Sequence, residues 1–253
     1  MDAEDSISRY VIIGYRLTFL VGLSSVAVAN YLLPELLQYG KTFVPDNPHR
    51  KDAPLWQRLF YATVPKGRFA HFYYLSTFLS MINLYSYHGS PIAWLILFHS
   101  VRRAYETTYV SKYTPTSRMH WSHYVVGIWF YSVLNLMINI KLHQGAVSSA
   151  LKPVPFLIFC FASWDQYKNH RILSRLVKYS LPTEGLFQIV CCPHYLDEVL
   201  IYASLIPYNW EFSWLLIWVF TNLSVSAREN KNYYDHRFPK ARVPQYAIIP
   251  LVL

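Results

Sequence analysis

The chain has 253 residues, of which 53% are hydrophobic and 15% are charged, and this length leaves room for one membrane domain without a second large soluble one. The net charge of +9 would suggest a nucleic-acid partner in a soluble protein. Here Lys and Arg stand mostly between apolar runs, which argues against nucleic acid and favours anionic lipid head groups or an anionic cofactor. The 22 Tyr and 8 Trp are typical of side chains at membrane interfaces.

Apolar runs predict an all-α polytopic membrane protein with about seven transmembrane helices, since roughly 20 apolar residues span a bilayer. The first run is too long for a signal-peptide core and is expected to be a retained helix. The fifth run is expected to kink at Pro153 and Pro155. In chain order the predicted helices cover residues 10–33, 71–88, 91–101, 122–140, 146–163, 186–206 and 210–224.

The segments between these runs are short and basic. We expect loops at residues 41–66, 102–118, 168–178 and 228–242. If they share one side of the membrane, that side is cytoplasmic by the positive-inside rule. The cations of segment 168–178 suit either such a flank or a phosphate site.

Two polar stretches, residues 163–171 and 193–198, interrupt or follow directly on apolar runs. A charge at bilayer depth costs about 2.5–3.5 kcal/mol on insertion scales, so such charges persist mainly where they line a cavity or a site. The pattern predicts a polar, functional interior and favours an enzyme or a transporter over an inert anchor.

Several common sites are absent from the sequence. No G-x-G-x-x-G motif follows a strand and no P-loop motif occurs, so any nucleotide would bind in a helical membrane cavity. His120, His123 and His143 form the best imaginable metal set, but no carboxylate or Cys has convincing spacing, and we predict no metal site. No G-x-S-x-G nucleophile motif occurs. The three Cys predict no disulfide framework.

Five segments in order resemble the polyprenol reductase branch of the steroid 5α-reductase family. They are VPKGRFAHFY at 64–73, LFHSVRRAYE at 97–106, WDQYKNH at 164–170, PHYLDE at 193–198, and the tail with NYY at 232–234, FPKAR at 238–242 and IPL at 249–251. The branch patterns they resemble are V-P-K-x-x-F-x-H-F-Y, L-H-x-x-R-R-x-x-E, Q-Y-K-x-H, P-N-Y-x-x-E and Y-P-K-x-R.

The sequence also departs from the family pattern. His194 stands where most members have Asn, and the usual His of the tail is replaced near Asn230. Ser100 falls where the Tyr of the steroid-reducing members would align. These departures argue against a steroid substrate more than against reductase chemistry.

The resemblance implies a single reductase domain over residues 1–253 in the endoplasmic reticulum membrane. Residues of about 10–101 would form the substrate side and residues of about 122–253 would hold NADPH. The implied reaction reduces the α-isoprene double bond of polyprenal on the way to dolichol for protein N-glycosylation. Carried over by position, the cofactor contacts would be Arg103, Gln166, His170, Arg175, Tyr179, His194, Glu198, Tyr234 and Arg242.

Chemistry favours an aldehyde substrate. Hydride adds to a carbon–carbon double bond only if the resulting charge can move, as it does onto the carbonyl oxygen of an unsaturated aldehyde but not onto an allylic alcohol. The site must then supply donors to that oxygen. The candidate catalytic donors are His71, Tyr73, His99 and Tyr105.

Three other classes stay open. A steroid or enoyl-CoA reductase would share the chemistry. An isoprenylcysteine-type methyltransferase would also pair helices with a nucleotide-derived cofactor, but its cofactor lacks phosphates, so Arg103 and Arg242 favour NADPH. A transporter predicts repeated halves, which the sequence does not show. The expected partners are a long-chain isoprenoid lipid and membrane lipids, with no obligate protein partner.

Overall fold

A computed structural model describes residues 3–32, 54–115, 117–177 and 180–250. Within these ranges the chain is mostly helical, which confirms the predicted helical class. The longer helices are α1 (Ala3–Leu32), α3 (Ala70–Ser86), α4 (Pro91–Tyr105), α5 (Trp121–His143), α6 (Pro153–Arg175), α7 (Pro193–Ala203) and α8 (Ser213–Arg237).

Shorter elements connect them. The described ranges also hold α2 (Leu55–Phe60), 3₁₀ turns at Lys66–Phe69, Gly185–Gln188, Ile206–Tyr208 and Trp210–Phe212, and a π-helical turn at Glu106–Val110. Strands β1 (Thr63–Pro65) and β2 (Arg118–His120) form an antiparallel ribbon in which Thr63 pairs with His120. The sequence patterns did not predict this ribbon.

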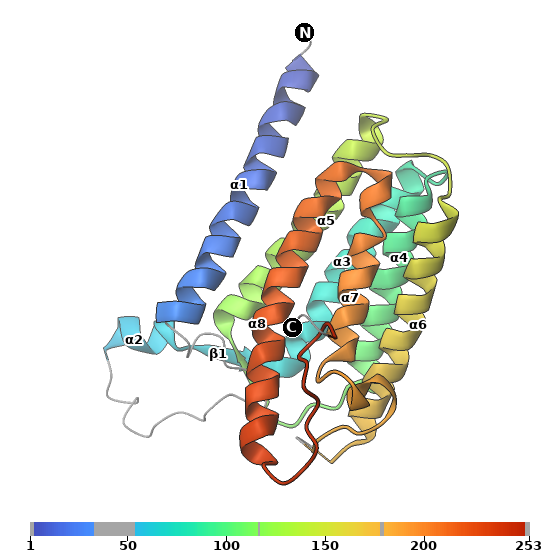
Figure 1. Ribbon diagram of the computed structural model, residues 1–253. Helices are drawn as coiled ribbons and strands as arrows, with labels where there is room; N and C mark the ends of the chain where they lie inside the picture. The colour runs from blue at the N-terminus through green and yellow to red at the C-terminus, as the bar shows by residue number, and fades with distance from the viewer. Residues whose placement is uncertain (1–2, 33–53, 116, 178–179, 251–253) are drawn as a thin grey trace.

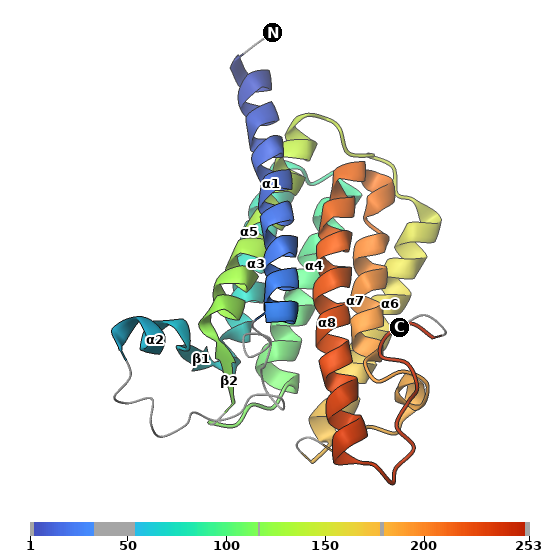
Figure 2. The ribbon, with the colours of Figure 1, turned by 60° about the vertical axis from the view of Figure 1, so that its left-hand side comes forward.

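The longer helices form a bundle in which consecutive helices run in opposite directions (Figure 1). Helix α3 packs against α4 and α5, α6 packs against α7, and α7 packs against α8. Figures 1 and 2 show α1 along the outside of this bundle, where it contacts α5 and α8. This packing brings side chains of α4, α6 and α7 into contact with one another.

Two glycines permit the closest helix contacts. A Cβ at Gly127 of α5 would lie 2.5 Å from the Phe72 ring of α3, and a Cβ at Gly22 of α1 would lie 2.6 Å from the Trp218 ring of α8. Real side chains do not tolerate such distances, so these two positions need glycine for the helices to approach. The aromatic rings fill the space that the glycines leave.

The basic segments lie at one end of the bundle. Helices α4, α6 and α8 all end at the lower end of the bundle in Figure 1. The segments that follow them begin there, namely the described residues of 106–120, 176–192 and 238–250. The turns 87–90, 144–152 and 204–212 lie at the opposite end. We call the lower end the basic end, because the segments predicted to be basic meet there.

Several predicted boundaries were wrong. Helix α6 begins at Pro153, so the two prolines start the helix instead of kinking it, as expected for a residue that needs no hydrogen-bond partner at the first position. Helix α7 begins only at Pro193 for the same reason, and residues 186–192 precede it. Parts of the predicted basic loops are helical, since α4, α6 and α8 continue to Tyr105, Arg175 and Arg237.

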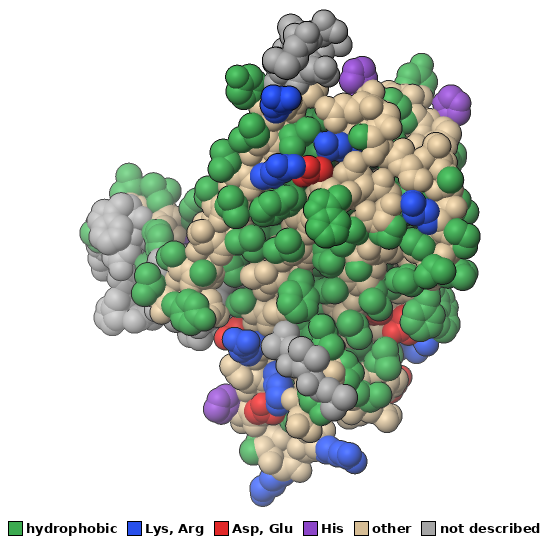
Figure 3. Space-filling model, turned by 45° about the horizontal axis from the view of Figure 1, so that its top comes forward, with side chains coloured by type: hydrophobic (Ala, Val, Ile, Leu, Met, Phe, Trp, Pro, Cys, Tyr) green, Lys and Arg blue, Asp and Glu red, His purple; other side chains and the backbone are tan. Residues whose placement is uncertain are grey.

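The outer surface of the bundle is unusually apolar. Figure 3 shows hydrophobic side chains over the middle of the visible face, with most Lys, Arg, Asp and Glu toward its ends. Large exposed apolar side chains include Tyr31, Phe78, Trp94, Leu157 and Phe161. Exposed apolar surface of this extent indicates contact with membrane or protein.

Two helices in the described part of the chain are long and apolar enough to cross a membrane by length and composition. They are residues Ser8–Leu32 within α1 and Trp121–His143, which is α5. This finding supports membrane association. Seven membrane spans stay a prediction.

Candidate active site

The charged centre of the molecule lies where α4 passes into the π-helical turn Glu106–Val110. Such wide turns are frequent at functional sites. Arg102 and Arg103 stand four and three residues before Glu106, a spacing that lets both guanidinium groups reach its carboxylate. Glu106 is 0% exposed, so its charge depends on these partners.

The Glu106 carboxylate binds three groups from two helices. Arg102 Nη1 donates to Oε1, and Arg103 Nη1 donates to Oε2 at 2.6 Å. His170 of α6 places its Nδ1 2.6 Å from the same Oε2. A carboxylate held in this way fastens the C-terminal end of α4 to the C-terminal part of α6.

Arg103 extends the network to α3. Its Nη2 donates to the Tyr73 hydroxyl at 2.8 Å, and its guanidinium carbon lies 4.7 Å from the centre of the Tyr73 ring. Its Nη1 also lies 2.9 Å from His170 Nδ1. Arg103 therefore orients a tyrosine from α3 and a histidine from α6 at once.

Gln166 of α6 joins this network to α7. Its Oε1 accepts from Arg102 Nη2 at 2.6 Å, and its Nε2 donates to Glu198 Oε2 at 2.5 Å and to the His194 carbonyl at 3.0 Å. Gln166 is 1% exposed. Because the buried Gln166 amide makes all of these bonds, it fixes the distance between the Arg102 guanidinium group and the Glu198 carboxylate.

His99 of α4 completes the set. Its Nδ1 lies 3.3 Å from Arg102 Nη2, and its Nε2 lies 3.6 Å from Glu198 Oε1, which is too long for a hydrogen bond. We call the whole set the charged cluster, which consists of Tyr73, His99, Arg102, Arg103, Glu106, Gln166, His170 and Glu198.

Two further tyrosines lie beside the charged cluster. Tyr131 of α5 and Tyr202 of α7 are 6% and 1% exposed. The Tyr131 ring packs 5.0 Å from that of Tyr73, and the Tyr202 ring packs 6.0 Å from that of His99. Sequence reasoning missed both, because a Tyr within an apolar run has no pattern that separates it from an interface anchor.

A second acidic group lies between α6 and α7. Asn169 Nδ2 donates to Asp165 Oδ2 at 3.0 Å and to Asp197 Oδ2 at 2.8 Å. All three side chains are buried, and Lys168 lies 3.5 Å from Asp165 at the surface. This group holds α6 against α7 beside the contact between Gln166 and Glu198.

The structure brings six of the thirteen predicted site residues together in the charged cluster. Of the residues implied by the resemblance, Arg103, Gln166, His170 and Glu198 belong to the charged cluster, and the His194 ring lies 5.5 Å from that of His170. Of the predicted oxygen donors, Tyr73 and His99 belong to it as well. Sequence reasoning missed Arg102 and Glu106 as site residues, although the R-R-x-x-E spacing was visible.

Other predicted residues lie elsewhere. His71 is exposed and pairs with the Tyr124 hydroxyl at 3.0 Å. Tyr105 is 51% exposed and packs on Tyr109, because it stands two residues beyond Arg103 and so faces nearly the opposite side of α4. Neither side chain reaches the charged cluster.

The predicted contacts near the basic end are spread out. Arg175 and Arg242 are exposed, and Tyr179 lies outside the described residues. Tyr234 packs with Cys191 and Cys192 in a small buried group beneath the C-terminal tail. The tail is held there by hydrogen bonds from the Cys191 and Cys192 amides to the Tyr246 and Ala247 carbonyls, each 2.9 Å long.

His120, the first histidine of the imaginable metal set, makes other contacts. His120 Nε2 lies 2.6 Å from the Phe60 carbonyl and its Nδ1 lies 2.7 Å from the Ser122 hydroxyl. Burial lowers the pKa of His120, so the neutral ring is favoured in this position. Among the described residues, no group of three or more His, Cys, Asp or Glu side chains is arranged to hold a metal ion.

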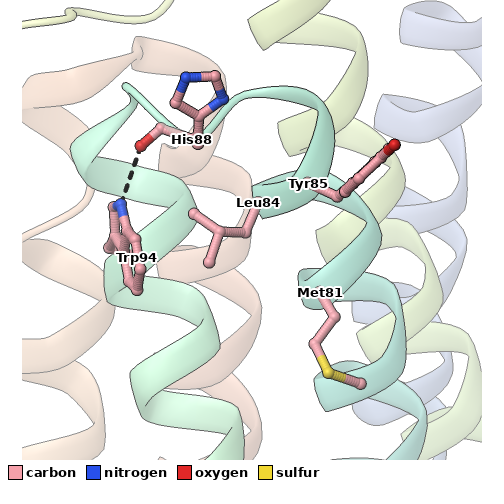
Figure 4. A pocket seen from close by; sticks show the side chains of 5 residues that line it. All are labelled: Met81, Leu84, Tyr85, His88 and Trp94. Atoms are coloured by element: carbon pink, nitrogen blue, oxygen red, sulfur yellow. Dashed lines mark hydrogen bonds between the residues drawn. The ribbon is translucent and has the colours of Figure 1, made fainter.

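A hollow of about 660 Å³ lies at the opposite end of α3 and α4 from the charged cluster. Figure 4 shows its lining, which is Met81, Leu84, Tyr85, His88 and Trp94. Trp94 Nε1 donates to the His88 carbonyl at 2.9 Å. This lining is mostly apolar and open, and it lacks the paired charges that redox chemistry on a polar head group would use.

A buried, paired set of charges inside a helical bundle with an apolar exterior defines a membrane-associated helical enzyme. Its family follows from comparison. The 3-oxo-5-alpha-steroid 4-dehydrogenase family model matches residues 90–253, well over half of the chain. The chain belongs to this family, which confirms the resemblance, and it is an oxidoreductase acting on a carbon–carbon double bond.

Curated relatives agree with the family. The chain is 55% identical over 250 residues to a polyprenal reductase of Saccharomyces cerevisiae, covering 99% of this chain and 98% of that protein. It is 29% identical over 279 residues to a polyprenal reductase of Caenorhabditis elegans, covering 88% of each. It is 31% identical over 196 residues to polyprenal reductase 2 of Oryza sativa subsp. japonica, covering 60% of this chain and 55% of that protein.

Proposed function

We propose that this protein reduces the α-isoprene double bond of polyprenal with NADPH, giving dolichal for dolichol synthesis and thereby for protein N-glycosylation. The observation that carries the proposal is the charged cluster, which puts histidine, tyrosine and paired charges inside a membrane-associated bundle. The polyprenal reductases to which the chain is similar support the substrate.

The chemistry of the substrate sets what the protein must supply. Bound NADPH would supply a hydride to the β-carbon of the unsaturated aldehyde. The negative charge then resides on the aldehyde oxygen as an enolate until a proton reaches the α-carbon. Buried, preorganised donors near that oxygen are the usual large contribution to such a step. The protein's part is therefore to hold the aldehyde oxygen against donors in a dry site.

The residues of the charged cluster fit one part of the cofactor. Arg102 Nε and Arg103 Nε are buried without a hydrogen-bond partner among the described residues. Glu198 and His170 each keep 13% of the side chain exposed, so the cluster opens to one side. These donors and acceptors suit ribose hydroxyls and a nicotinamide amide.

The phosphates need other partners. The two guanidinium groups of the charged cluster already balance the carboxylates of Glu106 and Glu198. Additional anions are better compensated by cations with no buried carboxylate beside them. We assign that role to the exposed cations of the basic end, among which Arg175 and Arg242 were predicted from the resemblance.

We also propose that the longer helices form a multi-pass bundle in the endoplasmic reticulum membrane, in which α7, with 11 residues, is too short to cross the hydrocarbon core by itself. The alternating helix directions and the apolar exterior support this arrangement. The lengths of α6 and α8 are sufficient, but their polar halves near the basic end lower their overall hydropathy. By the positive-inside rule the basic end faces the cytosol. A long isoprenoid could then keep its tail in lipid while its aldehyde enters the bundle.

The test uses the purified full-length protein in detergent with lipid and NADPH. Polyprenal, polyprenol and a steroid enone are supplied in parallel, and products are identified by mass spectrometry. We expect a gain of two hydrogens on polyprenal alone. A gain on polyprenol under aldehyde-free conditions would contradict the enolate argument, and a gain on the steroid alone would move the assignment to steroid reduction.

A further inference from the structure

Tyr202 carries a buried hydroxyl that nothing in the described part of the chain satisfies. Its side chain is 1% exposed, and its hydroxyl has no hydrogen-bond partner there. Buried polar groups are nearly always hydrogen-bonded, so an isolated one requires an explanation. A ligand that supplies the missing acceptor is such an explanation.

The position of Tyr202 points to the same ligand as the charged cluster. Tyr202 stands four residues after Glu198 on α7, so the two side chains share one face of the helix. The His99 ring lies 6.0 Å from the Tyr202 ring. His99 Nε2 is also buried without a hydrogen-bond partner among the described residues. Two adjacent unsatisfied groups thus border one side of the charged cluster.

The walls around Tyr202 are apolar. The Phe130 ring packs 5.6 Å from the Tyr202 ring, and the neighbouring Ile201 and Leu205 are 1% and 0% exposed. Tyr131 lies beside Tyr202 and is placed to donate toward the Tyr202 oxygen, which leaves the Tyr202 proton without an acceptor. A hydroxyl among such neighbours has little competition from water, and a hydrogen bond from it to a developing charge is correspondingly strong.

Other hydroxyls near the cluster are already engaged. The Tyr73 hydroxyl accepts from Arg103 at 2.8 Å. The Ser100 hydroxyl lies 2.7 Å from that of Ser76. The Tyr202 proton has no acceptor among the described residues, so it is available to a substrate.

We propose that Tyr202 is a catalytic residue whose hydroxyl donates a hydrogen bond to the aldehyde oxygen of the substrate. This inference rests on the proposed function. As the hydride adds to the β-carbon, the carbon–carbon π electrons shift and the oxygen takes the negative charge, which Tyr202 stabilises. A solvent-derived proton then adds to the α-carbon and restores the carbonyl group. The two-electron oxidation of NADPH to NADP⁺ balances the reduction.

Kinetics of Tyr202→Phe test this role, with Tyr208→Phe as the matched control. Tyr208 is also a buried tyrosine, but its hydroxyl accepts from the Lys152 amide, away from the charged cluster. We expect Tyr202→Phe to lower kcat/KM for polyprenal by about 10²-fold, as for loss of one oxyanion donor, with the Kd for NADPH unchanged. Tyr208→Phe should stay within about threefold of the wild type on the same scale.

A spectroscopic measurement avoids dependence on turnover. The probe is a short isoprenoid enal labelled with ¹³C at its carbonyl, bound to the wild type with NADP⁺, and its carbonyl stretch is read by infrared difference spectroscopy. A hydrogen bond lowers the stretching frequency. We expect a lowered frequency in the wild type and a return toward the unbonded value in Tyr202→Phe.

The outcomes separate the two levels of the proposal. If the wild type reduces polyprenal but Tyr202→Phe retains its kcat/KM, or if the wild-type carbonyl stretch is not lowered, Tyr202 is not the donor while the proposed function stands. If the wild type does not reduce polyprenal, the proposed function fails and this inference falls with it. Where Tyr202→Phe does not fold, a wild-type carbonyl stretch that is not lowered still rules out Tyr202 as the donor.

Discussion

Two neighbouring regions of buried polar side chains differ in charge and in completeness of hydrogen bonding. Between α3, α4 and α5 the polar residues are Ser and Asn. Asn135 accepts from Ser80 at 2.8 Å and donates to Ser76 at 3.2 Å, and Asn83 donates to the Asn135 carbonyl at 3.0 Å. We call this the Ser/Asn ladder, which consists of Ser76, Ser80, Asn83, Ser100, Asn135 and Asn139.

The charged cluster is the opposite case. It contains two carboxylates and two guanidinium groups, and Arg102, Arg103 and His99 keep buried atoms without hydrogen-bond partners among the described residues. The described contacts leave no such atom in the Ser/Asn ladder. Small satisfied polar side chains hold apolar helices together. We propose that the charged cluster, with its unsatisfied atoms, binds the ligand and that the Ser/Asn ladder does not.

The largest expected effect is a loss of stability caused by Glu106→Gln in the charged cluster. The change removes the charge that compensates Arg102 and Arg103 in a buried site, so we expect the free energy of unfolding to fall by about 3–5 kcal/mol. Thermal and denaturant unfolding in detergent measure it. The control is Asp235→Asn, whose exposed pair with Lys231 should contribute less than about 0.5 kcal/mol. Equal stability of the two variants would contradict the importance of the cluster to the fold.

Gln166→Leu should have the next largest effect, mainly on cofactor binding. The variant removes the amide that links Arg102 to Glu198, so both groups lose their fixed positions. Loss of hydrogen bonds to charged groups costs about 1.5–3 kcal/mol, and we expect NADPH affinity to fall about tenfold or more. Titration of NADPH fluorescence measures the Kd. An unchanged Kd would separate the charged cluster from cofactor binding.

Asn135→Leu is the matched change in the Ser/Asn ladder. It removes the acceptor of the Ser80 hydroxyl and the donor to Ser76, whereas Asn83 keeps its bond to the backbone carbonyl of residue 135, so the free energy of unfolding should fall by about 1–3 kcal/mol. The Kd for NADPH and the KM for polyprenal should not change at temperatures where the protein is folded. A tenfold loss of cofactor affinity in this variant would erase the distinction between the two regions.

The smallest expected effect is the pH dependence of stability that comes from His120, at the end of the β1–β2 ribbon. His120 Nδ1 accepts from the Ser122 amide at the start of α5, and burial lowers the pKa of His120. The unfolded chain therefore binds a proton more readily than the folded one, so stability should fall as pH drops below about 6.5. The loss is limited to about 1 kcal/mol, typical of an N-cap.

Comparison of Tm at pH 7.5 and 5.5 measures this effect. His120→Asn keeps an N-cap residue without a titrating ring and should show a smaller drop than the wild type. The control is His88→Gln, an exposed histidine at the opposite end, which should behave as the wild type does. Equal drops in His120→Asn and the wild type would assign the acid sensitivity to other groups.

Much of the fold followed from apolar runs. Their number and order predicted the longer helices, because burial of an apolar face dominates helix formation in a chain of this kind. The ends were less predictable. Charges at 168–175 suggested a loop, yet no Gly or Pro stops α6 there, and Asn169 and Gln166 find buried partners that let the helix continue.

The site was only partly predictable. The family resemblance identified Arg103, Gln166, His170 and Glu198, which meet in the charged cluster. It did not reveal that Glu106 organises them, because the R-R-x-x-E spacing shows neither the burial of Glu106 nor its contact with His170 of α6. Tyr202 was missed because an unsatisfied hydroxyl can be recognised only once its neighbours are known.

The most direct test of the central claim follows a single hydrogen. The purified protein reduces polyprenal with NADPH that carries deuterium on the transferred position of the nicotinamide, and the position of the label in the product is read by mass spectrometry and NMR. We predict deuterium on the β-carbon of dolichal and a solvent hydrogen on the α-carbon. Deuterium on the former aldehyde carbon, with the double bond intact, would contradict it.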